Sequence, residues 1–116
     1  MKIVLTTKSE TDAKSLKANI IKTIKDGEEI DTWSHKKASN TGSDMIYHNP
    51  DQYVKTPEKN VIFRVDLDKE NVSFTTTIWK DNPNPTEEMK SYHVGRLTEV
   101  LLAHFRDSFE GFYIEK

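Results

Sequence analysis

Cysteine is absent from this 116-residue sequence, which excludes disulfides, thiolate metal sites and cysteine nucleophiles. Only four glycines are present and they lie far apart, so no glycine-rich loop can cradle a phosphate group. The chain begins with only three consecutive apolar residues, Ile3 to Leu5. A secretory signal needs roughly 7–15 apolar residues and a membrane span about 20. We therefore expect a cytoplasmic protein that makes no contact with a membrane.

An excess of one charge is also lacking, because the net charge is −2. Residues 1–60 carry ten lysines and nine acidic residues, and residues 61–116 carry seven basic and ten acidic residues. Arginine, which makes forked contacts to phosphates, is missing from the first 60 residues. Dedicated nucleic-acid binders usually carry a strong basic excess. This balance disfavours nucleic acid as a partner.

The apolar pattern predicts an α+β fold in a single domain, residues 1–116. We expect strands at residues 2–7, 28–37, 45–48, 61–67 and 72–80, helices at residues 9–26 and 85–110, and a short strand or docked tail at 112–114. The order is β-α-β-(β)-β-β-α. It predicts two layers, with a mostly antiparallel sheet of four to five strands and both helices packed on one face.

Local signals mark the ends of both helices. Ser9 is a typical N-terminal cap, and Gly27 suits the left-handed position that follows a helix. Asn84 as cap, with Pro85 in the first turn, predicts the start of the second helix. Gly111 is expected to end that helix.

Residues 61–80 give the clearest β signal, since apolar and polar side chains alternate on both sides of a polar turn. The side chains predicted to face the helices are Val61, Phe63, Val65, Val72, Phe74 and Ile78. The side chains predicted to face outward are Ile62, Arg64, Ser73, Thr75, Thr77 and Trp79. Outward tryptophan and arginine are typical of protein interfaces.

Three arrangements of the outward Trp79 remain open. The irregular segment 38–60, with Tyr47 and Tyr53, covers it; a second copy of the chain covers it in a homodimer; or it lies open to a partner. The leading interpretation is a non-enzymatic protein-binding module of the inhibitor, immunity or regulatory type. It would use the outer sheet face, segment 38–60, or both.

Two other functions compete with this interpretation. In the first, His35 and His48 approach each other if their strands pair, and with Tyr47 and Tyr53 they line the pocket of a small enzyme or ligand-binding protein. In the second, single-stranded nucleic acid stacks its bases on Trp33 or Trp79. The patterns predict no catalytic residue, no metal ligand and no cofactor, and they favour a protein that is not an enzyme.

The lysines of the first helix form a basic flank within an arc of about 140° on the helical wheel. They are Lys14, Lys17, Lys22 and Lys25. A solvated face is the simplest interpretation. Contact with an acidic partner or a phosphate backbone is the functional one.

Overall fold

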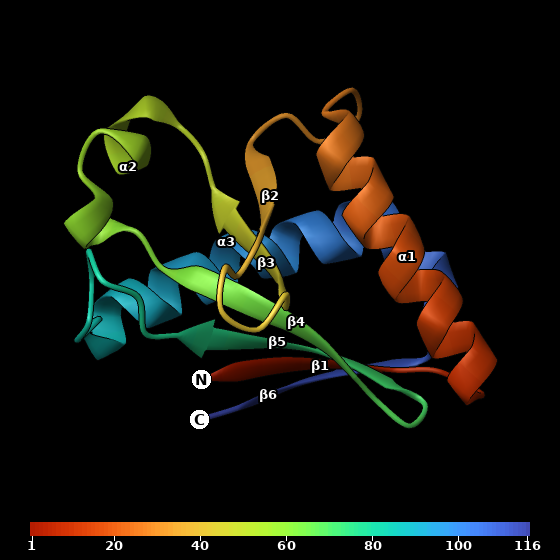
Figure 1. Cartoon of the computed structure of the whole chain (residues 1–116). Coiled ribbons are helices and arrows are strands. Elements are labelled where there is room, and N and C mark those ends of the chain that lie inside the picture. Colours follow the sequence, from red (N-terminus) through yellow and green to blue (C-terminus); the bar gives the residue numbers. More distant parts are fainter.

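One antiparallel sheet of six strands organises the computed structural model, which describes residues 1–116 (Figure 1). The strands are β1 (Lys2–Thr6), β2 (Trp33–Lys37), β3 (Asp44–His48), β4 (Ile62–Asp68), β5 (Asn71–Thr77) and β6 (Gly111–Glu115). Their order across the sheet is β2-β3-β4-β5-β1-β6, and every neighbouring pair is antiparallel. The α+β class is confirmed. The strand count exceeds the predicted four to five because both short apolar segments, 45–48 and 112–114, pair within the sheet.

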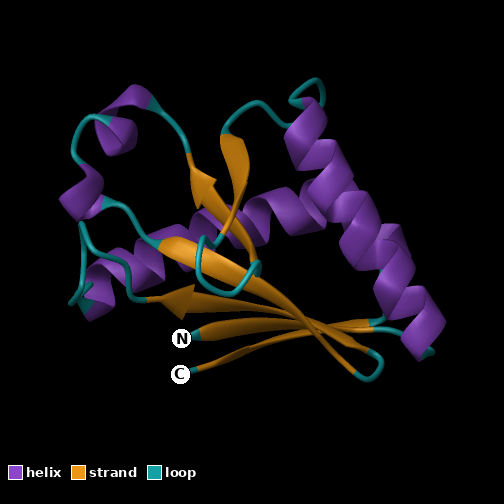
Figure 2. Ribbon diagram, viewed as in Figure 1, coloured by secondary structure: helices purple, strands orange, loops and turns teal.

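Two long helices and one short one complete the fold. They are α1 (Glu10–Asp26), α2 (Asp51–Val54) and α3 (Glu87–Phe105), with 3-10 turns at Pro57–Lys59 and Arg106–Ser108. Figure 2 shows α1 and α3 on the same side of strands β1, β5 and β6. No helix is both long enough and apolar enough to cross a membrane. The prediction of two helices was short by one, because segment 38–60 contains the single turn of α2.

The ends of α1 follow the sequence signals. The Ser9 side chain accepts a hydrogen bond of 3.1 Å from the Asp12 amide, and Gly27 adopts a φ of 68°. The predicted bounds of α3 were wrong at both ends. Its cap is Thr86, which accepts from the Met89 amide at 3.1 Å. The α-helix ends at Phe105, because a 3-10 turn follows at Arg106–Ser108. This turn brings Phe109 into the core, where it is 5% exposed.

The core lies between the helices and one face of the sheet. It contains the inward residues Phe63, Val65, Val72 and Phe74 together with apolar residues of α1 and α3. The prediction for Ile78 was wrong, because β5 ends at Thr77 and Ile78 is 73% exposed. The inward position before it belongs to Thr76, whose hydroxyl bonds the Met1 carbonyl at 3.1 Å.

The second strand is shorter than predicted. Residues 28–32 form a connection instead, and β2 begins at Trp33, whose side chain is 2% exposed in the core. On the opposite face of the sheet lie Ser34 and Lys36, as strand alternation requires. Neither α1 nor α3 covers that face, so the outer side chains of β2, β3, β4 and β5 largely determine its chemistry.

Candidate functional site

A groove of about 820 Å³ crosses the outer face of the sheet beside Trp79. We call it the Trp79 groove, and it is lined by residues 36–41, 43, 45, 62, 64 and 77–81. Met45 and Ile62, which are 8% and 2% exposed, form its apolar floor. The loop between β2 and β3 forms one wall, and the residues after β5 form the other.

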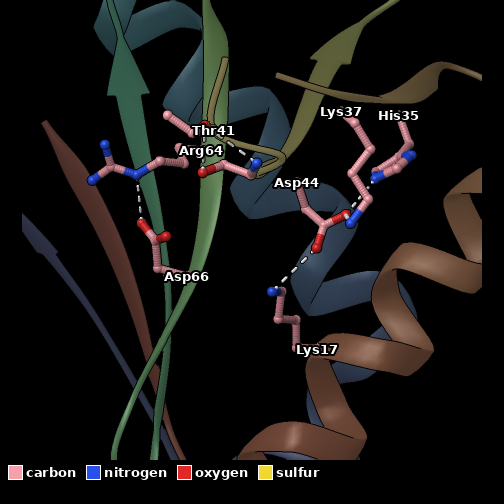
Figure 3. Close-up of polar contacts among 8 residues, drawn as sticks. Lys17, His35, Lys37, Thr41, Asp44, Arg64 and Asp66 are labelled. Carbon is pink, nitrogen blue, oxygen red and sulfur yellow. Dashed lines mark hydrogen bonds and ion pairs between the residues drawn. The ribbon is translucent and has the colours of Figure 1, made fainter. Parts of the chain in front are cut away.

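The register of the sheet places the predicted outward residues around this groove. Thr77 lies opposite Ile62 in the β4–β5 pair, and Thr75 lies opposite Arg64. Arg64 and Thr77 line the Trp79 groove, whereas Thr75 lies further along β5, next to Lys2 of β1. Arg64 donates to Asp66 at 2.7 Å, which holds its guanidinium over the outer face (Figure 3).

Trp79 is half-buried and anchored by one end of its indole. The indole N–H donates to the Asn60 carbonyl at 3.4 Å, and the Asn82 side chain donates to the same oxygen at 2.9 Å. Above the ring, the Lys36 ammonium lies 5.0 Å from the centroid of Trp79 and 5.9 Å from that of Tyr47. A cation at this distance is attracted to the ring face.

A second pocket of about 300 Å³ lies on the other side of Trp79. Tyr47, Tyr53, Val54 and Pro57 line it, so the irregular segment contributes walls to both pockets. Segment 38–60 therefore flanks the indole and leaves part of it exposed, which differs from the arrangement in which it seals Trp79 inside the monomer.

A third pocket, of about 470 Å³, lies between α1 and the β2–β3 hairpin. We call it the α1 groove. Its charged lining consists of the lysines at positions 14, 17, 22, 25 and 37, with Asp26 and Asp44. The predicted basic flank of α1 thus faces a concave surface shared with β2 and β3.

Asp44 holds two of these lysines and one histidine (Figure 3). Its carboxylate lies 2.9 Å from the Lys37 ammonium, 3.2 Å from the Lys17 ammonium and 2.7 Å from His35 Nε2. Burial alone raises the pKa of the Asp44 carboxyl, but these three partners outweigh burial and hold that pKa well below its ordinary value. Asp44 therefore fixes the positions of Lys17 and Lys37 in the lining of the α1 groove.

Lys37 lines both grooves, so the Trp79 groove and the α1 groove meet at β2. Together they contain seven lysines, one arginine and three aspartates, which gives +5. The remaining residues contain nine of the 17 basic and 16 of the 19 acidic residues, which gives −7. A chain with a net charge of −2 thus concentrates its positive charge around these two grooves.

The strands of His35 and His48 pair as the small-pocket prediction required, with His48 opposite Trp33 and His35 opposite Ile46, but the side chains have different partners. His35 bonds Asp44 at the α1 groove, while the Tyr47 side chain lies on the outer face near Lys36. His48 lies on the helix side, with ring centroids 5.2 Å from Trp33 and 5.1 Å from Tyr53. None of the five main pockets is lined by His35 or His48.

His48 instead packs edge-on against His93 of α3, with 6.1 Å between ring centroids. Burial, together with the nearby His93 and Arg96, lowers the pKa of His48 to about 4. Burial also lowers the pKa of His93, whose Nδ1 bonds the Met89 carbonyl at 2.9 Å. No group of three or more His, Cys, Asp or Glu side chains is placed to hold a metal ion.

The sequence interpretation missed Lys36 and Lys37 as site residues. A usable signal was present, because adjacent residues of a strand point to opposite faces. A Lys-Lys pair in an expected strand therefore puts one ammonium on each face. What alternation could not show is that Trp79 lies under one lysine and the α1 lysines lie beside the other.

Comparisons with protein families, with curated proteins and with solved structures find no match to this chain. Arguments about function therefore rest on the geometry of the grooves.

Proposed function

We propose that this protein is a non-enzymatic interaction module that binds an acidic protein partner through the Trp79 groove. The observation that carries the proposal is the half-buried Trp79, which lies between two pockets with a lysine ammonium above its ring. Around it, Arg64, Lys80 and the hydroxyl groups of the β2–β3 loop offer hydrogen-bond donors. Aromatic and arginine side chains beside an apolar floor supply the central contacts of many protein interfaces.

Single-stranded nucleic acid fits this surface less well. A base that stacks on an indole needs one ring face free. The Lys36 ammonium lies 5.0 Å from the centroid of Trp79 and covers one of its two faces, so only the other face is left for stacking.

The test compares partner capture by the wild-type protein and two variants. Trp79→Ala removes the central side chain of the groove. Tyr113→Ala is the matched control, because Tyr113 is an aromatic residue on the same outer face, 43% exposed, but on β6 at the far edge of the sheet. Proteins captured from the native host are identified and their binding is repeated with purified components.

We expect the Trp79 variant to lose at least about tenfold in affinity for the reconstituted partner, as central interface residues do. The Tyr113 variant should retain its affinity within about twofold. Both variants should keep the far-UV circular dichroism spectrum of the wild-type protein. A Trp79 variant that unfolds, or that binds the partner as tightly as the control, contradicts the proposal.

A further inference from the structure

Strand β2 forms one edge of the sheet, and this edge lies between the two basic grooves. β2 pairs only with β3 and stands at the end of the strand order. Its outer-face residue Lys36 lines the Trp79 groove, and Lys37, which follows it, lines both grooves. Any chain placed beside β2 would therefore meet lysines on both faces of the sheet.

Most lysines on this side have no acidic partner of their own. Lys14, Lys22 and Lys25 of α1, and Lys36 and Lys80 beside Trp79, take part in none of the ion pairs of the structure. Five unpaired ammonium groups thus line the two grooves that meet at β2. Unneutralised charge of one sign on a concave surface draws in chains of the opposite sign.

The other edge of the sheet has the opposite character. β6 carries Glu115, which pairs with Lys2 at 3.6 Å, and it is preceded by Glu110, which pairs with Lys8 at 3.6 Å. Only one lysine, Lys116, follows it. The two edges therefore differ in charge although both offer an unpaired backbone, which makes β6 a natural control for β2.

We propose that an extended acidic segment of the protein partner adds to β2 as a further antiparallel or parallel strand of the sheet. The inference rests on the proposed function and specifies how the partner is held. A strand added to an exposed edge gains main-chain hydrogen bonds, and its alternate side chains reach both faces. Asp or Glu on one face would meet Lys36, and on the other face Lys37 and the α1 lysines.

A protein segment fits this edge better than a nucleic-acid strand does. Only a polypeptide carries amide and carbonyl groups at the spacing of a β-strand. The three aspartates of the grooves, of which Asp44 lies closest to β2, would repel a continuous line of phosphates but leave room for spaced carboxylates.

The probe is a synthetic peptide of about ten residues that repeats the pattern Glu-Glu-Val-Val. This pattern puts acidic side chains on both faces of an extended strand, and valine favours that conformation. The matched control peptide carries lysine in place of glutamate. Binding to the full chain is followed at low ionic strength by NMR, with residue-resolved hydrogen exchange of the backbone amides.

We expect the acidic peptide to slow exchange of β2 amides by roughly tenfold or more and to leave β6 amides within about twofold. The lysine peptide should do neither. Raising the ionic strength from about 0.05 M to about 0.5 M should weaken binding, because the Debye length shortens.

A charge-reversal pair tests the role of the lysines. The double variant Lys36→Glu with Lys37→Glu should bind the acidic peptide at least about tenfold more weakly. Lys69→Glu with Lys116→Glu changes the net charge equally, away from both grooves, and should stay within about twofold. Equal losses in the two variants would mean that only overall charge matters and would overturn the inference.

The remaining outcomes separate this inference from the proposed function. Peptide-induced shifts around Trp79 without protection of β2 amides would overturn strand addition and leave the Trp79 groove as a binding site. Absence of any peptide binding would overturn the inference, while the capture experiment with Trp79→Ala decides the proposed function by itself. The last outcome concerns an oligothymidylate of about ten nucleotides. If it binds more tightly than the peptide, and if the Lys36/Lys37 variant loses this binding, the edge is a nucleic-acid surface instead.

Discussion

Trp33 and Trp79 are the only two tryptophans of the chain, and they lie on opposite faces of the same sheet. Trp33 is 2% exposed, and its ring centroid lies 5.2 Å from that of His48 and 6.0 Å from that of Phe63. Trp79 is half-buried under the Lys36 ammonium, between two pockets. The same type of side chain thus lies sealed in the core on one face and partly exposed on the other.

The difference between the faces follows from where the helices pack. Both long helices cover the face that carries Trp33, Phe63 and Phe74, and that face is apolar and closed. The opposite face has an apolar floor, with Ile62 and Met45, beneath a layer of lysines, arginine and hydroxyl groups. Loss of a side chain should therefore affect mainly folding on the inner face and mainly binding on the outer one.

The largest expected effect compares the two tryptophans directly. Trp33→Ala should lower the free energy of unfolding by about 3–5 kcal/mol, because it opens a cavity in the closed core. Trp79→Ala should lower it by about 1 kcal/mol, since it removes a partly exposed ring and one hydrogen bond to Asn60. Guanidinium unfolding followed by circular dichroism measures both values. Equal losses would show that the outer face is as much a core as the inner one.

A smaller effect concerns the pH dependence of the inner face. Burial holds the pKa of His48 at about 4 in the folded protein, against 6.5 for a free histidine. The unfolded chain therefore binds more protons between these values. The free energy of unfolding should be highest above pH 6.5 and should fall by about 2–3 kcal/mol as the pH drops to about 4. Buried His93 adds to the fall in the same direction.

The variant His48→Phe isolates this contribution. It keeps a ring against Trp33 and Tyr53 but has no group that titrates. Between pH 7 and 4.5 its free energy of unfolding should change less than that of the wild-type protein, in parallel urea titrations. Identical pH profiles would mean that His48 is not held neutral by its surroundings.

The smallest effect compares one aspartate from each face. Asp44→Asn should lower the free energy of unfolding by about 1–2 kcal/mol, because a shielded carboxylate loses Lys17, His35 and Lys37 together. Asp66→Asn should lower it by less than about 0.5 kcal/mol, since its pair with Arg64 is exposed. Thermal unfolding monitored by circular dichroism resolves this difference. A larger loss of unfolding free energy for Asp66→Asn than for Asp44→Asn would contradict the view that the inner face matters mainly for folding.

Elements with strong local signals were predicted correctly. The β4–β5 hairpin follows the alternation of Phe63, Val65, Val72 and Phe74, and the Ser9 cap determines the start of α1. Ile78 was misplaced, because alternation shows which residues share a face but not where a strand ends. The end of α3 was also missed, since Phe109 enters the core through a 3-10 turn that its periodicity does not predict.

The candidate site was predicted only in part. Alternation placed Arg64, Thr75 and Thr77 outward, and the helical wheel put the lysines of α1 on one flank. His35 and His48 line none of the pockets described above, because Asp44 binds one imidazole and the core encloses the other. Which partner each histidine meets depends on contacts between segments far apart in the chain.

The sequence by itself determined the class of fold, the caps of α1, the inward face of the hairpin and an even balance of charge. These properties depend on neighbours within a few residues, where periodicity and capping act. Only the tertiary structure decided that the positive charge gathers around β2. The lysines come from α1, from the β2–β3 hairpin and from the residues after β5, which are separated in sequence and meet through the packing of the core. Electrostatic potential depends on the distances between charges in space, and the order of residues along the chain does not give these distances.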